Sequence, residues 1–317
     1  MKKLQKGMAL LLTCVLAGGL LTGCGASTNT AATTEASSET ASTETAASTQ
    51  AAATEEATQA AGGESELLKT IKDRGYIIIG SSNDAPFFYE NVDTGELEGI
   101  DVEILKEICN RLGIPDIQMK VVDFSNLLVE LNNDSIDMVT DAMYIKDERL
   151  DMALFTDVWY TEGEAIVTKS DSEFTTKESL VDATMGAQPG TAFYETAQQW
   201  LDEGKIKELV GYENQATLMT AVNTGKVDAV MTDGIVSAYT LEQDSSLDLK
   251  LMSPYEAEAV GQIGAATRFE DQDFLNEVNG ALNDMKEDGT LLSILEGFGL
   301  NEDYFVNVED GKTTNVQ

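Results

Sequence analysis

The sequence contains no histidine, and basic side chains are scarce in it. It has 20 lysine and arginine residues against 56 aspartate and glutamate residues, so the formal net charge over 317 residues is -36. Without histidine the chain has no imidazole base, no histidine-ligated zinc and no serine–histidine or cysteine–histidine nucleophile pair. Several large classes of enzyme depend on a histidine for catalysis, and the sequence therefore argues against them. The negative charge repels phosphate backbones and excludes nucleic acid as a partner.

Cysteine is also rare, with three residues in the whole chain. Cys14 lies in an apolar N-terminal segment, Cys24 ends that segment, and Cys109 alone remains in the body of the chain. No disulfide can therefore form within the body. Cys109 shares a helical stripe with Leu105 and Leu112, a pattern that predicts a small buried hydrophobic residue rather than a reactive thiol.

The N-terminal apolar run is too short to be a typical membrane-spanning helix. Three lysines precede an uncharged stretch from Gly7 to Gly23, whereas a span needs about 20 residues. The sequence Leu21-Thr22-Gly23-Cys24 resembles the bacterial lipobox. That resemblance implies a signal peptide over residues 1–23 and lipid attachment at Cys24; the alternatives are a retained anchor helix and a non-lipidated signal peptide with a chance cysteine. The mature protein is then expected on the outer face of a bacterial cell membrane, in the periplasm if a second membrane exists.

Residues 24–63 hold almost only alanine, threonine, serine, glutamate, glutamine and glycine after the cysteine. They contain no lysine, no arginine and no aliphatic side chain larger than alanine, so they predict a disordered tether behind the lipid anchor. Removing the three signal lysines and the five tether glutamates leaves 17 basic and 51 acidic residues, a net charge of -34, in the body. The acidity therefore belongs to the folded part.

In the body, short apolar runs alternate with longer helical patterns. The runs at 76–79, 117–122, 138–140, 184–188 and 227–231 predict strands, and 125–132, 192–202 and 235–242 predict helices. This alternation is typical of mostly parallel sheets covered by helices. A weak repeat supports two such lobes, because the pattern over 127–139 recurs 91 positions later over 218–230. A ligand site between two lobes would lie where the carboxyl ends of both sets of strands meet.

One segment carries a specific resemblance. The sequence Gly99-Ile100-Asp101-Val102-Glu103-Ile104, followed by Ile108, Cys109 and Leu112, is similar to the signature of family 3 extracellular solute-binding proteins, the polar amino-acid receptors of ABC importers. The resemblance continues through the segments 143–149, 155–157, 188–191, 227–233 and 264–268, and spans nearly all of residues 66–300. It implies an α/β, two-lobed periplasmic-binding-protein type II fold joined by two crossover strands. Lobe 1 is then expected over 64–161 and 262–317, and lobe 2 over 162–261.

The resemblance also implies how a ligand is held. Arg149 is expected to bind a carboxylate with its guanidinium fork, Gly190 and Thr191 to contribute at a helix N-terminus, and Asp233 to bind the ligand ammonium. Asp141 and Met143 complete the expected set near Arg149. On their own, Arg149 fits a surface ion pair, Thr191 a helix cap and Asp233 another cap.

The loop from Asn83 to Tyr89 is one residue shorter than in most amino-acid receptors and resembles the ectoine-binding branch of the family. In that branch an acidic residue and three aromatic residues surround a cationic ring. The matching positions are Asp84, Phe87, Phe124 and Tyr144. Aromatic faces attract desolvated cations by about 0.5 to 2 kcal/mol each, so such a box has a physical use. The alternative is that Phe87 and Phe124 are core residues.

We therefore expect a monomeric receptor without catalytic residues, cofactor or metal, which captures a polar amino acid or similar small zwitterion by hinge closure. Its partners would be that ligand, an ABC permease and the membrane. Three alternatives stay open at this point: an ectoine-like osmolyte receptor, a periplasmic enzyme resembling cyclohexadienyl dehydratase with an acid such as Asp84 or Glu162, and a sensor or adhesin without transport.

Overall fold

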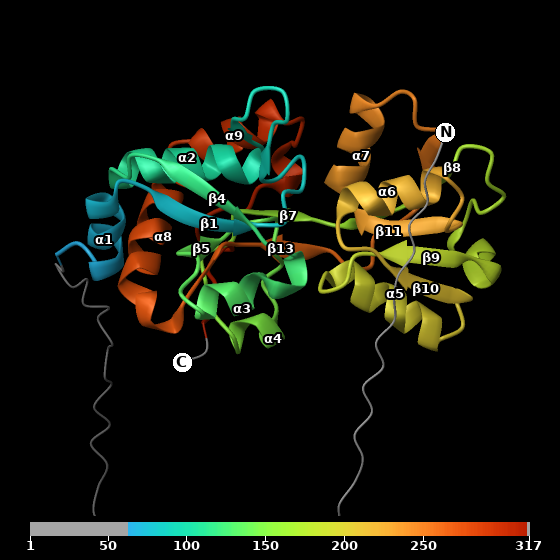
Figure 1. The fold of residues 1–317 in the computed structure, drawn as a ribbon, viewed down its shortest axis with the longest axis horizontal. Helices are drawn as coiled ribbons and strands as arrows, with labels where there is room; N and C mark the ends of the chain where they lie inside the picture. The colour runs from blue at the N-terminus through green and yellow to red at the C-terminus, as the bar shows by residue number, and fades with distance from the viewer. Residues whose placement is uncertain (1–62, 316–317) are drawn as a thin grey trace, which may run out of the picture. The chain divides into compact units, whose positions relative to one another are not determined.

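The computed structural model of the chain describes residues 63–315 (Figure 1). The expected signal peptide, the lipid site at Cys24 and nearly all of the expected tether lie outside the described residues. Over residues 63–315, no helix combines the length and the apolar composition that crossing a bilayer requires.

The first lobe is built on a five-stranded sheet with the strand order β4–β1–β5–β14–β6. β1 runs parallel to both β4 and β5, whereas β14 runs antiparallel to β5 and β6. Four strands therefore point the same way and β14 opposes them. The strands are β1 (Ile77–Ser81), β4 (Ile117–Val121), β5 (Met138–Val139), β6 (Leu154–Phe155) and β14 (Ala266–Thr267), and a separate hairpin pairs β2 (Tyr89–Glu90) with β3 (Leu97–Glu98).

The second lobe repeats this arrangement in the order β10–β9–β11–β8–β12. β9 is parallel to β10 and β11, and β8 is antiparallel to β11 and β12. The strands are β8 (Glu164–Lys169), β9 (Thr184–Ala187), β10 (Glu208–Gly211), β11 (Ala229–Asp233) and β12 (Leu249–Leu251). The repeat in the sequence is therefore structural, since it joins a helix to the middle strand of each sheet, β5 in one and β11 in the other.

Two crossover strands connect the lobes. The chain leaves the first sheet through β7 (Tyr160–Glu162) and returns through β13 (Gly261–Ile263), and these two strands pair antiparallel. In each sheet the opposed strand, β8 or β14, directly follows a crossover and takes the fourth position in the order. This topology confirms the expected two-lobed fold with two crossover strands.

Helices cover both sheets (Figure 1). In the first lobe α3 packs on β1 and β5, while α2, α8 and α9 pack against one another; in the second, α6 and α7 lie on one face and α5 on the other. The helices are α1 (Glu66–Arg74), α2 (Ile100–Leu112), α3 (Leu127–Asn132), α4 (Asp147–Leu150), α5 (Ala192–Asp202), α6 (Gln215–Asn223), α7 (Gly234–Gln243), α8 (Gln272–Glu287) and α9 (Thr290–Gly297). Cys109 is 4% exposed on α2, and burial raises the pKa of its thiol to about 12, as expected of a core residue.

The start of α2 holds the loop that carries Asp84 and Phe87. Gly99 has a φ of 130°, and an added Cβ would lie 2.1 Å from the Phe87 carbonyl oxygen. This close approach allows the N–H groups of Ile100 and Asp101 to donate to the carbonyls of Pro86 and Phe87, at 2.8 and 3.0 Å. The signature glycine is therefore required by backbone contact.

Asp101 ties the same helix to two further parts of the molecule. Its carboxylate accepts hydrogen bonds from the Thr140 hydroxyl at 2.8 Å, the Ala142 N–H at 2.8 Å and the Tyr160 hydroxyl at 2.7 Å. Three donors offset the cost of burying this carboxyl group. Helix α2 thereby fixes the segment after β5 and the crossover strand β7.

We predict that Gly99→Ala lowers the free energy of unfolding by about 3 kcal/mol, because the new Cβ meets backbone atoms that cannot rotate away. Urea denaturation followed by circular dichroism measures the change. Gly95→Ala is the control, since Gly95 also has a positive φ of 71° but no atom within 4 Å of an added Cβ. Equal losses in the two variants would contradict this account of Gly99.

Candidate functional site

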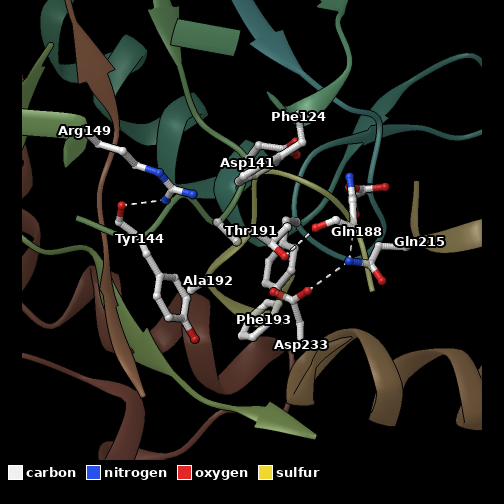
Figure 2. Close-up of a pocket in the computed structure, with 13 residues that line it drawn as sticks. Phe124, Asp141, Tyr144, Arg149, Gln188, Thr191, Ala192, Phe193, Gln215 and Asp233 are labelled. Carbon is white, nitrogen blue, oxygen red and sulfur yellow. Dashed lines mark hydrogen bonds between the residues drawn. The ribbon is translucent and has the colours of Figure 1, made fainter. Parts of the chain in front are cut away.

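A cavity of about 340 Å³, counting the space at its open side, lies between the two lobes. Residues of both lobes line it, and Figure 2 shows most of their side chains directed toward one another. The lining residues are Asp84, Phe87, Phe124, Asp141, Ala142, Tyr144, Arg149, Gln188, Thr191, Ala192, Phe193, Gln215 and Asp233.

Eight of the ten residues expected to bind a ligand line this cavity, and two do not. Met143 is 2% exposed and packs in the hydrophobic cluster of α3, beside Leu128 and Phe155. Gly190 is not a lining residue either, although the next residue, Thr191, is. An added Cβ on Gly190 would lie 2.9 Å from Ser125 Cα, so its backbone packs closely on the other lobe. Ligand contact by the eight lining residues stays a prediction.

Arg149, on α4, reaches across from the first lobe to the second. Its Nη1 donates to the Tyr144 carbonyl at 2.7 Å and its Nη2 to the Gly190 carbonyl at 2.8 Å (Figure 2 shows the first of these bonds). Burial lowers the pKa of the guanidinium to about 10, so the group remains charged at neutral pH. A guanidinium has five N–H donors, and these two bonds leave others for an anion.

Helix α5 begins at the cavity, and Thr191 caps it. The Thr191 hydroxyl donates to the Gln188 carbonyl at 2.7 Å and accepts the Tyr194 N–H at 3.1 Å. Its hydrogen is therefore committed within the second lobe. The geometry of a helix start leaves the N–H groups of Ala192 and Phe193 without a carbonyl partner inside the helix, and both residues line the cavity. The cap prediction for Thr191 is correct, and the donors it presents are backbone groups.

Asp233 ends β11 and lies 6% exposed in the cavity wall. It occupies the N-cap position of α7, but its side chain makes no cap hydrogen bond. Instead it accepts from Gln215 Nε2 at 3.1 Å, and the same amide nitrogen lies 3.0 Å from Gln188 Oε1 (Figure 2). Gln188 and Gln215 thus orient Asp233 toward the cavity. Neither was expected to be a site residue, although Gln188 begins a matched motif.

The four residues of the expected aromatic box all line the cavity, but their faces are partly used by the protein. The Arg149 guanidinium lies 5.4 Å from the centroid of Phe124, and Phe87 stacks on Tyr160 at 6.5 Å. The Tyr144 hydroxyl lies 3.2 Å from the Glu162 carbonyl and 3.0 Å from the Ala259 carbonyl, and its ring fills the space beside Gly261. Phe87 is therefore both a core residue and a cavity residue.

Carboxyl groups dominate the charge around the cavity. Burial raises the pKa of Asp84 to about 6, and burial also raises the pKa of Asp141, Asp233 and Glu162 above the ordinary range. Glu162, on β7, is 3% exposed, and neither of its carboxyl oxygens accepts a hydrogen bond from a donor among the described residues. Its carboxyl group lies beside that of Asp233, whose charge, after burial, does most to raise the pKa of Glu162. An ionised group without donors is costly in such a place, so we infer that Glu162 is protonated at neutral pH.

The lobes contact each other on both sides of the cavity. Lys146 of the first lobe forms an ion pair with Glu195 on α5, close to the Arg149 contact. On the other side, the hydroxyls of Tyr89 and Tyr239 lie 3.3 Å apart. The described arrangement is therefore a closed one, in which the cavity is bounded by both lobes.

Two sheets of the same order, a pair of crossover strands and a cavity between the lobes define a binding protein of the type II periplasmic class. The model of the family described as bacterial extracellular solute-binding proteins, family 3, matches residues 77–301, and the chain belongs to this family.

Named relatives and solved structures agree with this membership. The L-cystine-binding protein TcyA of Bacillus subtilis (strain 168) is 28% identical over 232 residues, which cover 73% of this chain and 84% of TcyA. The ABC transporter glutamine-binding protein GlnH of the same organism is 27% identical, covering 71% and 82%. The crystal structure of the ancestral amino acid-binding protein AncCDT-1, a precursor of cyclohexadienyl dehydratase, is 27% identical with a TM-score of 0.65, covering 73% and 98%.

The protonation of Glu162 predicts a pH dependence of stability. Its pKa in the folded chain lies above the ordinary value of 4.5, so the folded state holds a proton that the unfolded state releases in the pH range between the two. Its contribution to the free energy of unfolding is complete below pH 4.5 and falls by about 1.4 kcal/mol per pH unit as pH rises through that range.

Glu162→Gln removes this loss, so the variant should gain stability relative to the native chain between pH 5 and pH 8, as measured by urea denaturation. Glu242→Gln, at an exposed position on α7, is the matched control and should leave the pH profile unchanged. Parallel profiles for the native chain and Glu162→Gln would show that Glu162 is ionised.

Proposed function

We propose that this protein is an extracytoplasmic solute-binding receptor of an ABC importer, which captures a polar amino acid or similar small zwitterion between its lobes. Delivery to a membrane permease would follow. The observation that carries the proposal is the charge arrangement of the cavity. Arg149 and the start of α5 form a cationic end, while Asp84 and Asp233 form an anionic end in the same enclosed space.

The cationic end suits a carboxylate. Arg149 offers the remaining N–H donors of a planar fork, and the N–H groups of Ala192 and Phe193 point from the positive end of the α5 dipole. These donors come from different lobes, and the Arg149 bond to the Gly190 carbonyl brings them together. A carboxylate would therefore be bound by both lobes at once.

The anionic end suits an ammonium group. The Asp233 side chain is held at the cavity by its hydrogen bond from Gln215 and makes no cap hydrogen bond to α7. Asp84 lines the same cavity from the other lobe. A ligand with a carboxylate and an ammonium would neutralise both ends. Since such a ligand contacts both lobes only when they are closed, it binds the closed state better than an open one and shifts the population toward closure.

The same cavity bears on the alternatives. An ectoine-like osmolyte remains a second candidate ligand, because the four residues of the expected aromatic box line the cavity: Asp84, Phe87, Phe124 and Tyr144. The face of Phe124, however, is already in contact with Arg149. The proposed function has no catalytic step, and the named relatives TcyA and GlnH are binding proteins. We place the hinge at β7 and β13, with lobe 1 over 64–161 and 262–317 and lobe 2 over 162–261, and we propose that the receptor acts as a monomer.

Arg149→Ala should weaken amino-acid binding at least about 100-fold, because a buried charge-assisted contact to the ligand carboxylate is lost. A thermal-shift screen against amino acids, polyamines and osmolytes first identifies the ligand, since about 100 times the dissociation constant stabilises by about 2.7 kcal/mol. Isothermal titration calorimetry then measures the change in affinity.

Arg111→Ala is the control for Arg149→Ala. Arg111 lies on α2 and pairs with Glu107 and Asp288, away from the cavity, so its removal should leave affinity within a factor of two or so. Unchanged affinity in Arg149→Ala would refute the proposed carboxylate site.

We also propose that Cys24 carries the lipid that anchors the receptor. Cys24→Ser should abolish incorporation of radiolabelled palmitate and move the protein from the membrane fraction to the soluble fraction in its bacterial host. Cys14→Ser, within the proposed signal peptide, is the control and should leave labelling intact. Equal palmitate labelling of Cys24→Ser and the native chain would exclude lipidation at Cys24.

A further inference from the structure

Two carboxyl groups of the cavity share one hydroxyl. Ser82 Oγ lies 2.7 Å from Asp84 Oδ2 and is also in hydrogen-bond contact with Asp141 Oδ2. The Ser82 N–H donates to the same Asp141 oxygen at 2.7 Å. Asp84 is 8% exposed and Asp141 is 3% exposed, and both line the cavity.

The hydrogen atoms at this group do not suffice for two ionised carboxylates. A serine hydroxyl has one hydrogen and can donate it to a single acceptor. With both aspartates ionised, one of the two oxygen contacts of Ser82 would therefore contain no hydrogen and would be repulsive. A proton on Asp84 or Asp141 supplies the missing hydrogen, because the protonated carboxyl group can donate to Ser82 Oγ.

The neighbouring serine does not replace that proton. Ser81 Oγ lies 2.8 Å from the Phe88 carbonyl and 2.9 Å from Asp141 Oδ1, and it accepts the Asn83 N–H at 2.9 Å. Its single hydrogen is thus already contested by two acceptors. The two hydroxyls together face more acceptor oxygens than they have hydrogens. The missing hydrogen must therefore come from a proton on Asp84 or Asp141.

The surroundings favour the protonated form of the pair. The pKa of Asp84 is raised to about 6, chiefly by burial; hydrogen bonding by Ser82 lowers it, and the nearby charge of Asp233 contributes to the rise. Burial, and next the charge of Asp84, raise the pKa of Asp141.

Other titratable groups face the pair from the elements around it. Asp233 of β11, Arg149 of α4 and Tyr144 share the cavity, and Asp101 of α2 accepts from Thr140 and Ala142, the residues on either side of Asp141. Arg149 is the only cation among the described residues that line the cavity, and its hydrogen bonds go to the carbonyls of Tyr144 and Gly190.

We propose that Asp84, Ser82 and Asp141 form a cation subsite that holds one proton in the ligand-free protein and exchanges it for the cationic side chain of a bound amino acid. On binding, the O–H bond of the protonated carboxyl group breaks, its electron pair stays on the carboxylate oxygen, and the proton passes to the buffer. The cation then lies between two carboxylates. This inference rests on the proposed function, which places the ligand in this cavity with its carboxylate at Arg149.

The exchange makes ligand selection depend on pH. A cationic side chain competes with the proton, so its affinity rises with pH, by up to tenfold per pH unit while the pair remains protonated. An uncharged side chain leaves the proton in place, and its affinity stays flat over the same range.

Isothermal titration calorimetry of the purified full chain at pH 7, in phosphate and in Tris, counts the protons released on binding, since these buffers differ in ionisation enthalpy. The probes are L-arginine and L-lysine, which carry a second cation, and L-glutamine, which does not. The native protein should release close to one proton per bound cationic amino acid and close to none with glutamine.

Asp141→Asn should still bind the cationic probe but release less than about a third of a proton, because no shared proton remains. Asp182→Asn makes the same charge change at an exposed position and should release as much as the native protein. If Asp141→Asn does not fold, infrared difference spectra of the native protein decide. A loss of protonated-carboxyl C=O absorption should appear in the difference spectrum on adding L-arginine and be absent on adding L-glutamine, whereas Glu162 stays protonated in both and cancels.

The inference is overturned if the native protein releases no proton with L-arginine or L-lysine, if it releases as much with L-glutamine, if Asp141→Asn releases as much as the native protein, or if neither cationic probe binds. Its failure differs from failure of the proposed function. In that second case, Arg149→Ala binds with native affinity whatever the proton count.

Discussion

The excess of buried carboxyl groups over cations around the cavity is the constraint on which the rest of the molecule depends. Asp84, Asp141, Asp233 and Glu162 lie within the closed protein, and Arg149 is the one cation among the described cavity residues. Buried negative charge is tolerated only when it is protonated, hydrogen bonded or neutralised by a ligand. Glu162 is inferred to use the first route, Asp101 uses the second, and the proposed function assigns the third to Asp233. This constraint does not apply to most acidic side chains of the protein, because they lie at the surface and are solvated.

The residues of the family signature stabilise the fold and do not line the cavity, although the signature indicated a binding function. Gly99 lets the start of α2 touch the backbone at Phe87, and Asp101 binds the segment after β5 and the strand β7 through three hydrogen bonds. One helix start thus positions the loop of Asp84, the segment of Asp141 and Tyr144, and a crossover strand. Neither signature residue lines the cavity, so they act by holding the residues that do.

The strand and helix patterns and the repeat could be predicted from the sequence, because they are local or nearly local signals, whereas the two crossover strands were implied by the family resemblance. The sequence also identified Arg149, Asp84 and Asp233 as cavity residues, since these charges stand in matched motifs. It did not identify Gln215 or Phe193, because an amide at a helix start and an apolar residue in a first turn have many uses, and only the packing of both lobes brings them to one cavity. Met143 was expected in the cavity because it stands in the same motif as Tyr144 and Arg149, but the backbone bends at Ala142, whose φ is 49°, and Met143 packs in the hydrophobic cluster of α3. The hydrogen deficit at Ser82 needs oxygen positions, which no sequence pattern supplies.

Recognition of a free carboxylate by Arg149 and the start of α5 is the central claim, and one comparison tests it directly. A thermal-shift titration with the best-stabilising amino acid and with its α-carboxamide keeps the ammonium and the side chain but removes the negative charge. The account predicts that the free amino acid raises the melting temperature and that the amide, at the same concentration, leaves it close to that of the ligand-free protein. Equal stabilisation by the two compounds would contradict it.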